Sequence, residues 1–359
     1  MVARRMKPRL VARTSMEWLA RFFLLFLLSV VLLGIVAARR GGNETIILHG
    51  SMPEGGGWQP SHLTAQVREP LNLRLTSDDV VHGFAVGVGP DGEKPELAEV
   101  EVKPGQMTEL TLTFDQPGTY TYVCTRWCGP NHWRMRGTIE VEGDRSDYEP
   151  SPVEPPLYVQ LGIDIDAPHP AAVVPESTPS TVRGAALNLN VPDELLSREN
   201  YMNRSPVDAW LALRGRPELS QLDDMALWDA AASLWRRQTN EEALALGEML
   251  YSQNCAACHG EGGAGDGVFA EAGAEGVIRP EARGHEVGSA TDFTRPDMLG
   301  ASNALLQGKI LRGGMGTGMP AWGPIFTEQE LQALLDYLWT FQFAVDGPDD
   351  ADSGGNHAP

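Results

Sequence analysis

The chain has 359 residues, of which 42% are apolar and 21% are charged, so it is long enough to form two or three globular domains. Its 39 glycines and 26 prolines predict long linkers between those domains. The net charge of −20 argues against binding to nucleic acid or to an anionic membrane surface, and it favours a basic protein partner, although solubility alone would explain it equally well.

Residues 1–40 combine a basic segment with an apolar run that extends from Phe22 to Ala38. Counted from Trp18, this run is long enough for one membrane-spanning helix. More basic residues precede the run than follow it, which predicts a cytoplasmic N-terminus in a bacterial membrane and the rest of the chain on the outer face. A signal peptide cleaved near Val36 and Ala38 is the alternative, and it also exports the rest of the chain.

Residues 44–143 show the two-residue alternation of short strands, separated by turns at Pro104-Gly105 and Pro117-Gly118. The pattern predicts an all-β sandwich or Greek-key barrel. The alternating apolar positions are Leu71, Leu73 and Leu75, Leu110, Leu112 and Phe114, Tyr120 and Tyr122, and Ile139 and Val141.

The remainder of the chain divides by composition into four parts. Residues 144–192 are rich in proline and acidic residues and predict a linker. Residues 193–240 predict a small helical connecting segment, in which Ala226–Trp235 resembles Leu331–Trp339 and leaves open a haem-less cytochrome remnant. Residues 241–343 predict an all-α domain that ends in an amphipathic helix, and residues 344–359 a disordered acidic tail.

Two of the four cysteines, Cys124 and Cys128, share one short loop with His132 and Met135. Soft sulfur and imidazole ligands suit copper, and a second thiolate allows two copper ions to be bridged. A further imidazole is then needed, and His82 follows a strand-like run. A disulfide and a zinc site are the alternatives; the thioether argues against zinc, and the histidines in register argue against a disulfide.

The other two cysteines, Cys255 and Cys258, precede His259 in the Cys-x-x-Cys-His pattern that attaches a c-type haem covalently. A glycine-rich stretch follows, which lets backbone lie against a flat macrocycle. The Met-Pro pair at Met319 predicts the sixth iron ligand, because a Met/His pair suits electron transfer. The rival ligands are Met315 on the same loop and, more weakly, Met298.

Residues 76–141 resemble the CuA domain of subunit II of haem-copper oxygen reductases, and residues 241–343 are similar to class I cytochromes c. The resemblance implies that Cys124 and Cys128 bridge two coppers. Its remaining copper ligands are His82 and Met135 on one ion, and His132 with the backbone carbonyl of Arg126 on the other. Arg126 stands where many relatives have a magnesium-binding glutamate, which puts that second metal in doubt. A single span fits the B-type branch better than the A-type.

The resemblance therefore implies a multidomain chain with an N-terminal transmembrane helix, a cupredoxin-like CuA domain and an all-α cytochrome c domain. We expect the electron-entry subunit of a cytochrome c oxidase, which passes electrons from an external basic cytochrome or copper protein through haem c and CuA to catalytic subunit I. The alternatives are the equivalent subunit of a nitric oxide reductase and a tethered redox carrier that acts alone. Nitrous oxide reductase would need a second, histidine-rich copper domain.

Several other residues carry weaker signals. Trp127 and Trp133 flank the copper ligands, where core packing is the more common role and a docking surface or transfer path the alternative. The remaining histidines have no partner pattern and are expected to be ordinary surface residues: His49, His62, His169, His285 and His357.

Overall fold

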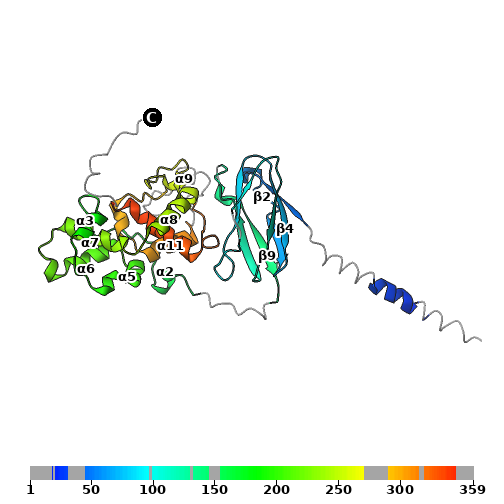
Figure 1. Ribbon diagram of the computed structural model, residues 1–359, viewed down its shortest axis with the longest axis horizontal. Coiled ribbons are helices and arrows are strands. Elements are labelled where there is room, and N and C mark those ends of the chain that lie inside the picture. The colour runs from blue at the N-terminus through cyan, green and yellow to red at the C-terminus, as the bar shows by residue number, and fades with distance from the viewer. Residues whose placement is uncertain are drawn as a thin grey trace, which may run out of the picture. The chain divides into compact units, whose positions relative to one another are not determined.

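The computed structural model describes residues 18, 21–30, 45–96, 99–129, 132–144, 154–270, 290–314 and 319–344 (Figure 1). The chain divides into two compact units, Met1–Ile46 and Ile47–Pro359. Residues 21–30 of the first unit are helical with exposed side chains. Across these described ranges, no helix combines the length and apolarity needed to cross a membrane. The predicted span continues past residue 30, outside the described residues, as does the acidic tail from residue 345 onward.

The strands of the second unit form a two-sheet sandwich (Figure 1). One sheet has the order β2-β1-β4-β7 and the other β3-β9-β8-β5-β6, and β3 is parallel to β9. This topology confirms the predicted all-β domain. The strands are β1 (Ile46–Gly50), β2 (Trp58–Gln59), β3 (His62–Gln66), β4 (Leu71–Ser77), β5 (His82–Val86), β6 (Val100–Val102), β7 (Thr108–Leu112), β8 (Gly118–Val123) and β9 (Arg136–Glu142).

The predicted alternation places its apolar residues between the two sheets. Leu73 and Leu75 of β4 are buried, and so is Ile139 of β9. An aromatic cluster lies at one end of this core, where Trp58 meets Phe84 edge-on with ring centroids 5.5 Å apart. Tyr122 of β8 completes the cluster, with its ring 5.5 Å from that of Phe84 in β5.

The helices of the second unit follow the sandwich in the chain (Figure 1). The expected linker, 144–192, differs from the structure because it contains two helices, α2 and α3. Ser180 caps α3, and Arg183 of α3 forms a bidentate ion pair with the buried Asp229 of α7. The helices are α2 (Leu157–Gln160), α3 (Thr181–Ala186), α4 (Asp193–Leu196), α5 (Arg198–Asn203), α6 (Pro206–Arg214), α7 (Asp224–Arg236), α8 (Glu241–Asn254), α9 (Ala256–His259), α10 (Asn303–Arg312) and α11 (Glu328–Leu338).

Two pairs of these helices cross in the same way. A Cβ on Gly184 of α3 would lie 1.8 Å from the carbonyl oxygen of Asp229 in α7. A Cβ on Gly247 of α8 would lie 2.1 Å from the carbonyl oxygen of Ala333 in α11. Asp229 and Ala333 occupy the same position relative to their N-caps, Asp223 and Thr327. The sequence similarity between α7 and α11 is therefore matched by a similar helix crossing.

Replacing Gly247 with alanine is expected to destabilise the helical domain, because backbone on both helices would have to move apart. Overpacking of this kind costs about 1–3 kcal/mol, more than the helix propensity that alanine gains. Urea denaturation followed by circular dichroism measures the free energy of unfolding. Gly262→Ala is the matched control, because a Cβ there meets nothing within 4 Å. Equal stability of the two variants would contradict the close crossing.

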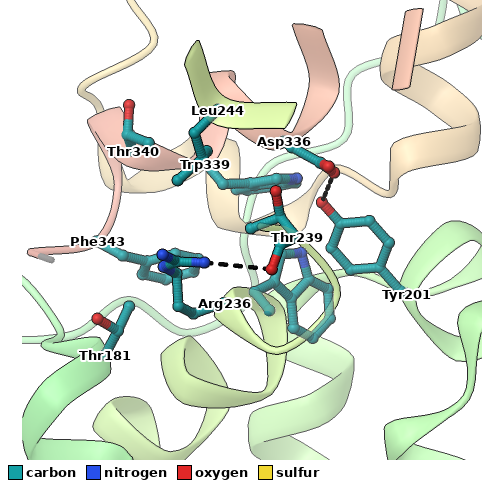
Figure 2. Close-up of a pocket in the computed structure, with 10 residues that line it drawn as sticks. Thr181, Tyr201, Arg236, Thr239, Leu244, Asp336, Trp339, Thr340 and Phe343 are labelled. Atoms are coloured by element: carbon teal, nitrogen blue, oxygen red, sulfur yellow. Dashed lines mark hydrogen bonds between the residues drawn. The ribbon is translucent and has the colours of Figure 1, made fainter. Parts of the chain in front are cut away.

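A buried seam joins α7 to α11, and its residues line a small pocket (Figure 2). The Tyr201 hydroxyl donates a 2.6 Å hydrogen bond to Asp336 of α11. Burial raises the pKa of Asp336, although the hydrogen bonds from Tyr201 and Gln332 oppose the effect. The rings of Trp235 and Trp339 meet edge-on at 6.2 Å. The segments around α7 and α11 are therefore in direct contact through this seam.

Candidate metal centres

The predicted copper ligands converge at one end of the sandwich. His82, Cys124 and Cys128 are buried, and a potential ligand atom from each lies within 4.8 Å of the others. The distances between donor atoms are 3.9 Å for Cys124 Sγ to Cys128 Sγ, 3.7 Å for Cys124 Sγ to His82 Nδ1, 3.4 Å for Cys128 Sγ to His132 Nδ1, 3.8 Å for Cys128 Sγ to Met135 Sδ and 3.1 Å for Cys124 Sγ to the carbonyl oxygen of Arg126.

Strand pairing explains this convergence. His82 opens β5, Cys124 follows the last residue of β8, and Met135 precedes the first residue of β9. Since β5 and β9 both run antiparallel to β8, the start of β5, the end of β8 and the start of β9 lie at the same end of the sheet. Gly50 at the end of β1 leaves the necessary space, because a Cβ there would lie 3.2 Å from both the His82 ring and the Met135 methyl group.

The two thiols are not joined, since their separation is about twice the length of a disulfide bond. A hydrogen bond from Cys128 lowers the pKa of Cys124 to about 3. The same hydrogen bond, together with burial, raises the pKa of Cys128. One thiolate therefore suppresses ionisation of the other, and both ionise together only if cations neutralise them. Two thiolates, two imidazoles, a thioether and a carbonyl fit a pair of copper ions.

Asp79 also belongs to the candidate site, although its role was not expected from the sequence. Its Oδ1 accepts a 2.8 Å hydrogen bond from His82 Nε2, which turns Nδ1 of the imidazole toward Cys124. The other carboxylate oxygen accepts the Met52 amide at 2.6 Å, so Asp79 is itself fixed. Burial opposes ionisation of Asp79, but the hydrogen bonds from Met52, Val80 and His82 lower its pKa. An aspartate three residues before a ligand histidine was the available signal.

Replacing Asp79 with alanine is expected to weaken copper binding about 10–100-fold, the usual effect of losing the group that orients a metal-binding histidine. Competition with a chelator of known affinity measures the change. Asp78→Ala is the matched control, because Asp78 is exposed and pairs with the surface residue His49. Equal copper affinity in the two variants would remove Asp79 from the site.

Arg126 contributes its backbone and its side chain to different neighbours. Its carbonyl faces Cys124, as the resemblance implied, while its guanidinium pairs with Glu101 at 2.7 Å. Glu101 also pairs with Lys103 at 2.6 Å. A carboxylate surrounded by two cations is already neutralised, which agrees with the doubt about a magnesium ion here.

The haem attachment residues lie where α8 passes into α9. Cys255 is the C-cap of α8 and Cys258 lies within α9, and neither forms a disulfide. His259 Nδ1 donates to the carbonyl oxygen of Thr291 at 3.0 Å, and the Phe293 ring stacks on the imidazole at 4.6 Å. Burial lowers the pKa of His259, which favours a neutral imidazole with Nε2 available to iron.

The methionine candidates separate by the core that each contacts. Met319 packs against the same apolar cluster as Cys255 and Phe293. Met298 instead packs against the cluster centred on α6 and α7. Met315 lies outside the described residues. The choice of Met319 over Met298 therefore has a structural basis, and its choice over Met315 stays a prediction.

The structure also describes the two tryptophans beside the copper loop and three of the remaining histidines. Trp127 is 44% exposed and stacks on Phe269 rather than entering the sandwich core, so the core-packing interpretation is wrong for this residue. Trp133 lies under the Arg134 guanidinium. The described histidines outside the metal sites make ordinary surface hydrogen bonds: His49 to Asp78, His62 to Thr138 and His169 to the carbonyl of Asp164.

Two family models match parts of the chain. Residues 61–142 match the periplasmic domain of cytochrome c oxidase subunit II, and residues 242–338 match cbb3-type cytochrome c oxidase subunit III. These ranges contain the predicted copper ligands and the predicted haem ligands respectively.

Curated relatives match over the sandwich. A cytochrome c oxidase subunit 2 from Thermus thermophilus is 36% identical over 86 residues, which cover 24% of this chain and 58% of the relative. An alternative cytochrome c oxidase subunit 2 from Bradyrhizobium diazoefficiens is 32% identical over 83 residues, 23% of this chain and 27% of the relative. The chain therefore spans less than two thirds of the length of these relatives.

Solved structures are similar at lower identity. A haem-copper terminal oxidase dimer structure contains a chain that is 23% identical, with a TM-score of 0.23 over 35% of this chain and 99% of that one. The periplasmic domain of subunit II from Bradyrhizobium japonicum is 21% identical, with a TM-score of 0.22 over 29% of this chain and 86% of that domain.

Proposed function

We propose, from the homology of this chain to cytochrome c oxidase subunit II, that it is the electron-entry subunit of such an oxidase. Electrons from an external donor would enter at a covalently bound haem c, pass to a binuclear CuA centre and leave for a separate haem-copper catalytic subunit. The observation that carries the proposal is the buried set of copper donors around Cys124 and Cys128.

The side chains would divide the work between the two centres. Cys255 and Cys258 would attach the haem, while His259 and Met319 would ligate its iron. Cys124 and Cys128 would bridge the coppers, with His82, Met135, His132 and the carbonyl of Arg126 as the remaining ligands. Bound copper and haem supply reversible one-electron chemistry. The chain itself holds the copper donors in buried positions: His82, Cys124, Cys128, His132 and Met135.

The proposal includes the location of the chain. The segment before residue 40 would anchor it by a single pass in a bacterial membrane, with both metal domains on the periplasmic side. The model matched by the sandwich is described as a periplasmic domain, which supports this orientation. The excess of acidic residues would attract a basic cytochrome or copper protein as donor.

The helices before the haem domain have a proposed origin. The crossing of α3 with α7 resembles that of α8 with α11, at equivalent positions along α7 and α11. We infer that residues 157–236 are a haem-less cytochrome-like half, because this segment contains no cysteine that could attach a haem. Its role would be to stabilise the haem domain through the buried seam.

Parallel gas measurements test the proposed function. The native detergent-solubilised complex is isolated through this chain and supplied with a reduced cytochrome, and consumption of dioxygen and of nitric oxide is followed. Rapid uptake of dioxygen with slight turnover of nitric oxide is expected. The reverse pattern would assign the chain to a nitric oxide reductase. Purification of the chain alone, with neither gas consumed, would make it an independent redox carrier.

A further inference from the structure

An aromatic stack links the copper loop to the haem attachment loop. Trp127 lies between the two copper-loop cysteines, and its ring stacks on Phe269 with centroids 4.2 Å apart and planes inclined by 27°. The same Trp127 ring lies 5.5 Å from the ring of His132. On the other side, the Phe269 amide donates a 2.9 Å hydrogen bond to the carbonyl of Ala257, which lies between Cys255 and Cys258.

A second contact joins the copper domain to the loop of the sixth haem ligand. Arg136 directly follows the copper ligand Met135, and its Nη1 donates to the carbonyl of Ala321 at 2.9 Å. Its guanidinium lies 5.4 Å from the centroid of the Trp322 ring. Both of these partners closely follow Met319 in the sequence. The two loops that supply the haem ligands are therefore both in contact with the copper domain.

Further contacts hold this arrangement. The Val88 amide donates to the carbonyl of Pro324 at 3.1 Å, so backbone from the two domains is in direct contact. Lys94 Nζ lies 2.6 Å from Glu330 Oε1, and both side chains are mostly buried. Val123, the last residue of β8, belongs to the same apolar cluster as Trp322. Apolar burial, a backbone hydrogen bond and an ion pair together define one docked orientation.

We propose that the haem domain docks on the copper domain in this orientation and that the Trp127–Phe269 stack is the contact through which electrons pass between them. The proposal rests on the proposed function. In the transfer, the haem iron is oxidised by one electron and the copper pair is reduced by one electron, and no bond is made or broken. The rate of electron tunnelling falls steeply with the distance between donor and acceptor. The stacked rings of Trp127 and Phe269 shorten the distance that the electron must cross between the two domains.

The role of the Trp127–Phe269 stack is tested in the full chain loaded with haem and copper. The haem is reduced by a light pulse, and the rate at which its electron reaches copper is followed. Trp127→Leu and Phe269→Leu are expected to slow the transfer severalfold, whereas Trp127→Phe keeps an aromatic ring and most of the rate. Trp133→Leu is the matched control, because this tryptophan also flanks a copper ligand but stacks on Arg134. Copper and haem spectra and potentials should not change.

Docking is measured separately in copper-free protein, through hydrogen exchange of the Val88 amide. Lys94→Glu should reduce its protection about fivefold, the effect of roughly 1 kcal/mol for such a pair. Trp127→Leu should reduce protection at most about tenfold, since a stacked pair contributes about 0.5–1.5 kcal/mol.

Two results would overturn the proposal. One is an electron-transfer rate in Trp127→Leu that is unchanged, or that falls only in proportion to the loss of Val88 protection. The rings would then stabilise docking without carrying the electron. The other is a Val88 amide that none of the variants affects. A parent protein whose haem never reduces its copper would instead overturn the proposed function, so the two failures are distinguishable.

Discussion

Replacing Cys128 with serine is expected to abolish the two-copper centre. Cys128 Sγ lies within 3.9 Å of Cys124 Sγ, His132 Nδ1 and Met135 Sδ, so one substitution removes the atom common to the whole site. A serine hydroxyl is a hard donor that stays protonated near neutral pH and cannot replace a bridging thiolate. Electron paramagnetic resonance of the copper-loaded protein should lose the signal of an electron shared between two metals, and bound copper should fall from two ions to one or none.

Thr125→Ser is the matched control for this experiment. Thr125 lies between the same cysteines, but its hydroxyl donates to Glu99 at 2.6 Å, away from the donor atoms. The control should keep both copper ions and the shared-electron signal. A shared-electron signal that survives in Cys128→Ser would contradict the bridging arrangement, and folding of the variant is checked by the far-ultraviolet circular dichroism of its sandwich.

The proximity of most candidate copper donors could be predicted because the sequence places them close together. Cys124, Cys128, His132 and Met135 share one loop, and local spacing constrains them wherever the loop lies. His82 is distant in sequence, and it is included because a further imidazole is needed and because the family resemblance assigns one there. The alternation of Leu71, Leu73 and Leu75 likewise required no knowledge of tertiary contacts, because a two-residue period is a local property of a strand.

The features that escaped prediction depend on contacts between distant segments. Gly50 matters because His82 and Met135 approach it, and neither is near it in sequence. Trp127 is a large aromatic residue of the kind that usually packs in a core, but its ring stacks on Phe269 in the helical domain. Helix α3 is short and contains Gly184, so its intrinsic helix propensity is poor. The ion pair between Arg183 and the buried Asp229 of α7 stabilises it instead. Local patterns do not report such tertiary stabilisation.

Replacing Met319 with histidine is expected to keep the covalent haem while lowering its reduction potential. Attachment depends on Cys255 and Cys258, which the substitution leaves intact. A thioether raises the potential of haem iron relative to an imidazole, and axial ligands set potentials over a range of roughly 0.8 V. The fall should therefore be large enough to measure by a redox titration of the haem absorption. Reduction of the haem by an external donor should slow in parallel.

Met298→Leu is the control that separates ligation from packing. Met298 contacts the cluster around α6 and α7, so its loss should leave the haem potential unchanged. Met319 packs against the same apolar cluster as Cys255, so a change there is expected to act at the iron. If Met319→His leaves both potential and donor reaction unchanged, the sixth ligand is Met315 and Met319 only packs beside the haem. In that case Met315→His should lower the haem reduction potential, because Met315 would then be the methionine that ligates the iron opposite His259.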